Sequence, residues 1–152
     1  MEWVPRVPLD RRRAFESLAH IDGFSDFQIT EKSSQGDIQA VAERDEYFPV
    51  YYVEPYKGNE AALGFDLASN PARLTALETA RDSGEMVVSK KINLVKLEKD
   101  NAGVLAFTPV YRIGMPHQTI EQRRMNLVGF TLGVIKLSSV VTDHQALSKV
   151  SG

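Results

Sequence analysis

The sequence predicts a single α+β domain, in which an antiparallel five-stranded sheet has helices packed beside it. Its 152 residues, 43% of them hydrophobic, can fill one core and are too few for two full domains. Two segments carry apolar residues at helical spacing, and five segments are rich in β-branched and aromatic residues. Because four of these five strands follow one another with only turns and loops between them, we expect antiparallel pairing.

Residues 1–43 are expected to hold a leading helix and a loop. The helix is predicted from Pro8 to Gly23, because proline suits a first helical turn and because Phe15 and Leu18 recur at helical spacing. The segment from Ser33 to Arg44 is polar and contains a glycine-aspartate turn signal. We interpret it as a loop or an irregular crossing that separates the first helix from the core.

The core is expected over residues 44–141, and it begins with a strand and a helix. Tyr47 to Glu54 is dense in aromatic and β-branched residues and is predicted to be a strand. A short helical piece is expected from Asn59 to Leu63. The second main helix is predicted from Pro71 to Ser83, because Asn70 is a good N-cap and the glycine that follows the segment supplies a left-handed stop.

Four further strands and a final short helix complete the predicted core. A long loop is expected from Gly114 to Arg124, and the last helix from Ser139 to Leu147. Gly129 and Gly133 fall in a predicted strand, so we interpret them as places where another backbone or a ligand approaches the sheet. The four predicted strands are Met86 to Ser89, Ile92 to Leu97, Val104 to Tyr111 and Leu127 to Leu137.

The composition shows no sign of catalysis, metal binding or nucleic-acid binding. Eighteen basic and twenty acidic residues leave a net charge of -2, and the basic run Arg11 to Arg13 is interpreted as a solvated helix face. There are no cysteines, and the three histidines lie far apart in the sequence. Phosphate loops and nucleophile elbows are absent from the sequence. We therefore expect no enzymatic activity, no cofactor and no metal site.

The sequence has no secretory signal pattern and no apolar run near the roughly 20 residues that a bilayer crossing needs. We therefore expect that this chain itself contains no membrane-spanning segment. If the parent protein is membrane-bound, we expect its stalk and transmembrane helices to lie outside these 152 residues.

Several short motifs that occur together in one known family follow one another from Arg44 onward. Trp3 to Val7 is similar to the segment that precedes these motifs in that family. Together they cover most of residues 44–141. The motifs are Arg44-Asp45-Glu46-Tyr47-Phe48-Pro49-Val50, Gly58-Asn59-Glu60-Ala61-Ala62-Leu63-Gly64-Phe65-Asp66-Leu67, Ala80-Arg81-Asp82-Ser83-Gly84, Phe107-Thr108-Pro109-Val110-Tyr111 and Gly129-Phe130. In this order and spacing, the chain resembles the CHASE domain, the extracellular sensory module of histidine kinases, diguanylate cyclases and plant cytokinin receptors.

The resemblance implies that residues 1–152 form one PAS-like, membrane-distal domain that senses a small molecule. In the family this domain is carried on a long stalk helix, which this chain is expected to lack together with the transmembrane helices. The parent is then expected to be a membrane-anchored histidine kinase or cyclic-di-nucleotide enzyme, dimeric through those stalk helices, with this domain in the periplasm. A structural or dimerising extracellular segment without a ligand is the alternative.

The resemblance also implies a set of ligand-binding positions. In cytokinin-type members the pocket is lined from the start of a helix, from the segment before it and from facing strands. Those positions fall here on Ala61, Leu67, Arg73, Ser89, Val95, Phe107, Phe130 and Gly133.

Two positions depart from the family pattern. The family usually has a proline where this chain has Lys90-Lys91, and cytokinin-type members use a carboxylate to hold adenine where this chain has Arg73. The second departure argues against a purine and favours an acidic ligand, held by Arg73 beside the backbone N–H groups of the helix start. The alternative for Arg73 is an internal partner such as Asp66 or Glu78, or a side chain that reaches out to solvent. For Asp66 itself, we favour a structural role as a local hydrogen-bond acceptor or an arginine partner.

Overall fold

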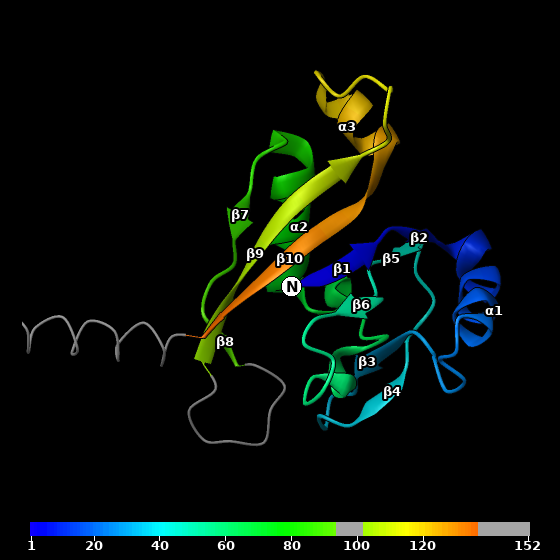
Figure 1. Cartoon of the computed structure of the whole chain (residues 1–152). Helices are drawn as coiled ribbons and strands as arrows, with labels where there is room; N and C mark the ends of the chain where they lie inside the picture. The colour runs from blue at the N-terminus through cyan, green and yellow to red at the C-terminus, as the bar shows by residue number, and fades with distance from the viewer. Residues whose placement is uncertain (94–101, 137–152) are drawn as a thin grey trace, which may run out of the picture.

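The computed structural model describes residues 1–93 and 102–136 and shows an α+β domain built on one antiparallel sheet (Figure 1). The strand order is β6-β1-β10-β9-β7, and β8 pairs with β9 on the same edge as β7, so the sheet is five strands wide. The predicted fold class is therefore confirmed. The strands of this sheet are β1 (Glu2–Pro5), β6 (Tyr52–Val53), β7 (Val87–Val88), β8 (Ile92–Asn93), β9 (Ala102–Tyr111) and β10 (Leu127–Lys136).

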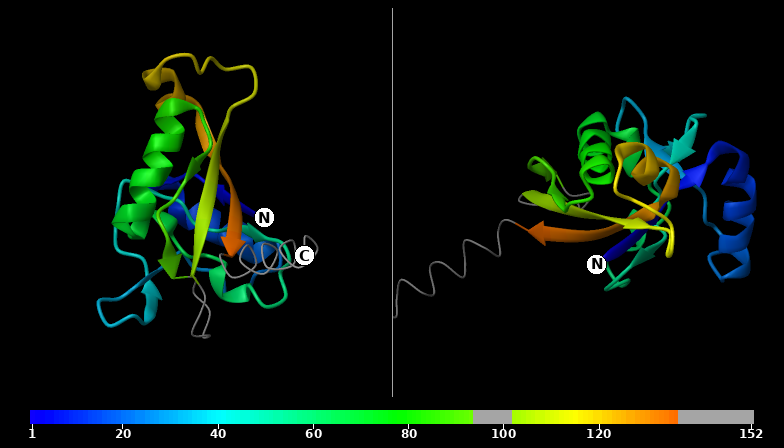
Figure 2. Two further views of the ribbon diagram at one scale, coloured as in Figure 1. Left: turned by 90° about the vertical axis from the view of Figure 1, so that its left-hand side faces the viewer. Right: turned by 90° about the horizontal axis from the view of Figure 1, so that it is seen from above.

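The main core lies between this sheet and helix α2 (Pro71–Ser83), which runs along one face of β9 and β10 (Figure 2). Val4 of β1 is paired with Phe130 of β10, and both side chains are fully buried on that face. The ring of Phe130 packs edge-on against that of Phe107, with centroids 6.3 Å apart. Apolar burial of this kind contributes about 1.5 to 3 kcal/mol per large side chain.

Helix α2 begins and ends where the sequence predicts. The side chain of Asn70 accepts hydrogen bonds from the backbone N–H groups of Ala72 and Arg73, at 3.0 and 3.2 Å. Pro71 occupies the first turn, where its missing N–H is not needed. Gly84 adopts the left-handed conformation, with φ of 76°, and ends the helix.

A second apolar cluster lies under the predicted leading helix. The structure forms that helix as η1 (Leu9–Arg11) followed by α1 (Arg12–Ile21), at the far side of the domain from α2 (Figure 1). Fully buried Ala19 and the edge-on rings of Phe15 and Phe27, 5.8 Å apart, lie in this cluster. The cluster includes Val7 and Tyr47, which are paired across two short strands, β2 (Val7–Pro8) and β5 (Glu46–Tyr47).

The predicted strand from Tyr47 to Glu54 is wrong as a continuous element. Its ends join different sheets, β5 and β6, while residues 48–50 pair irregularly with residues 64–67. Two causes are local: Pro49 has no N–H, and the N–H of Phe48 donates to the side chain of Asp66 at 2.8 Å. The aromatic density of the segment reflects burial and not a regular ladder.

The predicted loop from Ser33 to Arg44 is also partly wrong. Strands β3 (Thr30–Lys32) and β4 (Ile38–Ala40) form a hairpin whose turn lies at Gly36. The turn signal was sound, but the strand residues on both sides are mostly polar or exposed, so no alternation of apolar residues marks them.

Two further elements were missed. The expected loop from Gly114 to Arg124 runs into helix α3 (Ile120–Asn126), which begins with a capping box between Thr119 and Gln122. Strand β1 lies inside the sheet, although its four residues include a proline. A segment of four residues is too short to show an alternating pattern, and a proline argues against a strand inside a sheet, so the sequence did not predict β1.

The short helical piece predicted from Asn59 to Leu63 is confirmed as η2 (Glu60–Ala62). The predicted strand from Ile92 to Leu97 is described only at its first two residues. The predicted final helix from Ser139 to Leu147 lies outside the described residues.

Asp66 connects three segments that are distant in the sequence. Its side chain is fully buried, and its Oδ1 accepts from the backbone N–H groups of Phe48 and Ala68, at 2.8 and 3.1 Å. Its Oδ2 lies 3.5 Å from the guanidinium of Arg44, which also pairs with Glu31. The structural role predicted for Asp66 is confirmed. It caps η3 (Leu67–Ser69), the short turn that leads into α2.

Replacement of Asp66 by alanine should lower the free energy of unfolding by about 3 kcal/mol, because it leaves a buried backbone N–H without an acceptor. Asp66→Asn should cost less, about 1 kcal/mol, because its Oδ1 can keep both backbone hydrogen bonds while only the contact with Arg44 is lost. Denaturant unfolding of both variants checks this order. Equal losses for the two variants would contradict it.

Gly129 and Gly133 should respond differently to alanine. A Cβ at Gly129 would lie 2.4 Å from the carbonyl oxygen of Val4 and 2.8 Å from Cα of Pro5, both backbone atoms. At Gly133 the nearest atom is Cβ of Ala106, at 3.9 Å. Gly129→Ala should therefore lose roughly 2 to 3 kcal/mol of stability, whereas Gly133→Ala should change it by less than about 0.5 kcal/mol. Thermal and denaturant unfolding of the matched pair test this, and a similar response at both sites would refute it.

Candidate ligand-binding site

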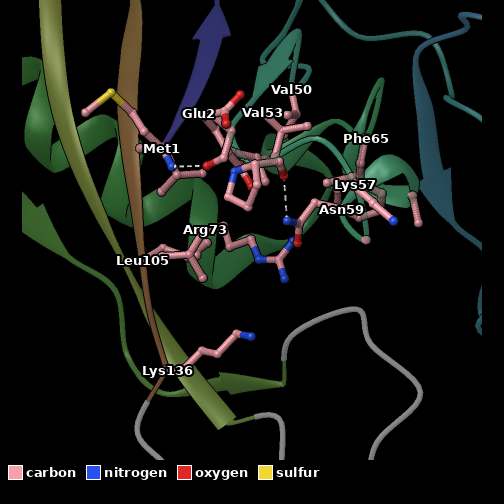
Figure 3. A pocket seen from close by; sticks show the side chains of 18 residues that line it. Met1, Glu2, Val50, Val53, Lys57, Asn59, Phe65, Arg73, Leu105 and Lys136 are labelled. Atoms are coloured by element: carbon pink, nitrogen blue, oxygen red, sulfur yellow. Dashed lines mark hydrogen bonds between the residues drawn. The ribbon is translucent and has the colours of Figure 1, made fainter. Parts of the chain in front are cut away.

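A cavity of about 360 Å³ opens between the sheet, the start of α2 and the chain from β6 to η3 (Figure 3). Its walls are mainly apolar, with Glu2, Arg73 and Asn59 among the polar groups that reach it. A concave apolar site with a few polar groups is typical of small-molecule binding. The lining residues are Met1, Glu2, Val50, Val53, Glu54, Pro55, Lys57, Gly58, Asn59, Ala61, Ala62, Phe65, Leu67, Arg73, Leu105, Leu132, Val134 and Lys136.

Arg73 projects from the first turn of α2 into this cavity (Figure 3). The residue is only 7% exposed, and its guanidinium lies over the ring of Phe65, 5.5 Å from the centroid. Its buried Nε has no hydrogen-bond partner. Burial lowers the pKa of Arg73, and the charge of Glu2 opposes that shift. The cation is thus held in a low-dielectric site.

Neither internal partner considered for Arg73 pairs with it. Asp66 is engaged by Phe48, Ala68 and Arg44, and Glu78 is exposed. Within residues 1–93 and 102–136, the side chain of Arg73 makes no hydrogen bond or ion pair. Arg73 is also only 7% exposed and lines the cavity, so its side chain faces the cavity and does not extend over the outer surface.

The expectation that free backbone N–H groups at the start of α2 lie beside Arg73 is wrong. Asn70 takes the N–H groups of Ala72 and Arg73 with its side chain and that of Leu74 with its carbonyl oxygen. Pro71 has none. An anion in the cavity would therefore meet the guanidinium and not the helix backbone.

Glu2 is a second charged group in the cavity, and the sequence reading missed it. The residue is 9% exposed, and it is paired across the sheet with Leu132 and Val53, which line the same cavity. Its side chain thus lies on the inward face of β1, where Val4 also points. Burial raises the pKa of Glu2, and the charges of the Met1 amino group and, to a smaller extent, of Arg73 oppose the shift. A charged residue at an inward strand position was the available signal, but it required knowing that β1 is a strand.

The structure brings three of the eight predicted ligand positions together. Ala61, Leu67 and Arg73 line the cavity. Phe107 and Phe130 lie on the same face of the sheet, fully buried in the core, two positions along their strands from the cavity-lining Leu105 and Leu132.

The other predicted positions lie elsewhere. The hydroxyl of Ser89 accepts from the N–H of Leu105 and donates to the carbonyl oxygen of Lys90, at 3.0 and 2.8 Å. Gly133 is on strand β10 one position from cavity-lining Leu132, so it faces the opposite side of the sheet. Val95 lies outside the described residues.

In the described ranges, no cluster of three or more side chains is suited to hold a metal ion. A helix long and apolar enough to cross a bilayer is not found in those ranges either.

If Arg73 is not part of the structural framework, Arg73→Met should leave the free energy of unfolding unchanged or raise it by up to about 1 kcal/mol, because it removes a desolvated cation. Arg44→Met is the matched control and should lower stability by about 2 kcal/mol, because it leaves Asp66 and Glu31 without their cation. Denaturant unfolding of the two variants separates the roles. A loss at Arg73 as large as that at Arg44 would mean that Arg73 supports the fold.

Comparison with known proteins places this domain. The family model described as the CHASE domain matches residues 1–150. The hybrid signal transduction histidine kinase A of Dictyostelium discoideum is 28% identical over 136 residues, which is 84% of this chain and 6% of that protein. The chain thus spans a small part of the curated relative that it matches. Because the family match covers nearly all of its 152 residues, the chain belongs to the CHASE domain family, the sensory domains of signalling receptors such as histidine kinases.

Proposed function

We propose that this domain binds a small acidic ligand in the cavity and that Arg73 holds the acidic group. The observation that carries the proposal is the guanidinium of Arg73, which is buried in the cavity wall without a hydrogen-bonding or ionic partner among the described residues. An unpaired buried charge lowers the stability of the folded state by several kcal/mol. Such a charge is therefore expected where a ligand supplies the missing partner. A carboxylate or phosphate fits the planar fork of the guanidinium.

The proposal extends to the parent protein. The domain would lie outside the cytoplasm as part of a membrane-anchored receptor, periplasmic in a bacterium, whose output is a histidine kinase or a cyclic-di-nucleotide enzyme. Family membership supports the sensory role, and the similarity to a hybrid histidine kinase supports the kinase output. Dimerisation would come from stalk helices beyond these residues. The domain itself would perform no catalysis.

The competing function is a structural or dimerising segment that binds no ligand. Such a segment has no need for a cavity with a desolvated cation in its wall, and filling that space with apolar side chains would stabilise it. The position of Arg73 in the cavity, and not in solvent, therefore favours a ligand.

A thermal-shift screen of carboxylic acids, amino acids and purines tests the function, since a compound that binds only the folded state raises its melting temperature. Small acids should raise it, and adenine-type purines should not. If no acid in the screen shifts the melting temperature and a cationic or purine compound does, the proposed ligand class is wrong.

For an acid identified in this way, Arg73→Ala should weaken binding roughly 10- to 150-fold, the loss of about 1.5 to 3 kcal/mol expected for a charged hydrogen bond. Arg73→Lys should keep part of the affinity, because it retains the charge but not the fork. Arg13→Ala, an exposed position on α1, is the control and should bind normally. Titration calorimetry on variants whose folding is checked by melting measures this. Unchanged affinity in Arg73→Ala would refute the assignment.

A further inference from the structure

Two opposite charges, and not one, are buried in the walls of the same cavity. Arg73 enters from α2 and Glu2 from β1, and each residue is more than nine-tenths buried (Figure 3). The positions come from different layers of the fold, the helix and the sheet. The cavity therefore presents hydrogen-bond donors from one wall and acceptors from another.

The two charges are not paired with each other. Each shifts the pKa of the other, so they are electrostatically coupled, yet their charged atoms do not come within the 4.0 Å that defines an ion pair. The amino group of Met1 also lowers the pKa of Glu2, by more than Arg73 does, but it donates its hydrogen bond to the carbonyl oxygen of Glu54, at 2.8 Å, and not to Glu2. Across the described part of the chain, the carboxylate of Glu2 accepts no hydrogen bond.

Because both charged residues line one cavity and do not pair with each other, a dipolar molecule bound there can be a partner for each of them. A simple carboxylate would satisfy Arg73 but would add a second negative charge near Glu2, which is unfavourable at low dielectric. A simple amine would pair with Glu2 but would add a second positive charge near Arg73. A molecule that carries both charges a short distance apart satisfies both groups and adds no net charge to the site.

We propose, on the basis of the function proposed above, that the ligand is an α-amino acid with an apolar side chain, its carboxylate held by Arg73 and its ammonium group by Glu2. The lining also includes the exposed charged residues Glu54, Lys57 and Lys136 and the amide of Asn59, and most of the remaining wall is apolar. The apolar lining includes Val50, Val53, Leu105, Leu132 and Val134. The side chain of the amino acid is buried against these residues, and Glu2 is a ligand-binding residue that selects for the ammonium group.

The experiment compares three molecules that share one branched aliphatic chain: leucine, 4-methylpentanoate, which lacks the amino group, and 3-methylbutylamine, which lacks the carboxylate. Titration calorimetry on the wild-type domain should give leucine an affinity at least about 10-fold above that of either truncated compound. If a preliminary thermal-shift series ranks valine, isoleucine, methionine or phenylalanine above leucine, the same comparison uses that amino acid and its deaminated and decarboxylated forms.

Variants then test which ligand group each of the two charged residues binds. Glu2→Gln should abolish the preference for leucine over 4-methylpentanoate and leave the affinity for 4-methylpentanoate unchanged or higher. Arg73→Ala should weaken both acids. Glu85→Gln, an exposed carboxylate outside the cavity lining, is the control and should keep the preference. Should Glu2→Gln fail to fold, Glu2→Asp retains the charge on a shorter stem and should reduce the preference.

The outcomes separate this inference from the proposed function. If 4-methylpentanoate binds as tightly as leucine, or Glu2→Gln keeps the preference, the amino-acid assignment is overturned while the role of Arg73 stands. If none of the amino acids binds but another acid does in an Arg73-dependent way, the assignment is likewise overturned. If Arg73→Ala leaves acid binding unchanged, both proposals fall.

Discussion

The buried carboxylate of Asp66 is the constraint on which the arrangement of the cavity depends. It takes one backbone hydrogen bond from Phe48 and one from Ala68, and it faces Arg44, so it holds together segments that no regular sheet connects. Removing a carboxylate from water is costly, and here several donors compensate for it. The flanking Phe65 and Leu67 are thereby fixed in the cavity wall, and η3 delivers the chain to the Asn70 cap, three residues before Arg73.

The buried and half-buried charges at Asp66 and at the cavity fall into two groups, which differ in how many hydrogen-bond and ionic partners they have. Arg44 lies between Glu31 and Asp66, and this network has partners throughout. Arg73 and Glu2 are more deeply buried than Arg44, yet neither makes an ion pair among the described residues. Because desolvation is offset in the first group and not in the second, the first contributes to folding and the second lowers stability. Unpaired charges that lower the stability of the fold are typical of binding sites.

The sequence predicted elements well where many residues repeat one signal. Helix α2 has a cap, a proline and a terminal glycine in agreement, and β9 and β10 are long apolar runs. Prediction failed where long-range contacts decide the structure: the segment from Tyr47 to Glu54 is broken by a side chain of residue 66, and β1 exists only because β10 and β6 flank it. The site shows the same division. Arg73 could be predicted as a site residue because it occupies a ligand-binding position of the family and reverses the charge found there. Glu2 could not be predicted, because its place in the cavity depends on strand pairing that no local pattern encodes.

The arrangement of charges in the cavity also affects the desolvation that accompanies ligand binding and the kinds of ligand that the site can distinguish. The N–H groups at the start of α2 are already taken by Asn70, so in the proposed site the recognition of charge would rest on side chains that different layers hold in place. Folding has already removed most of the hydration of these side chains, so a ligand would lose its own hydration and displace only the remainder of theirs. Pre-organised groups of opposite sign therefore discriminate by charge arrangement more than by shape, since a ligand with one wrong charge leaves a buried group unpaired. The apolar walls from β10, β9 and the chain before η3 then add affinity in proportion to the surface that they cover, with little power to distinguish neighbouring aliphatic side chains.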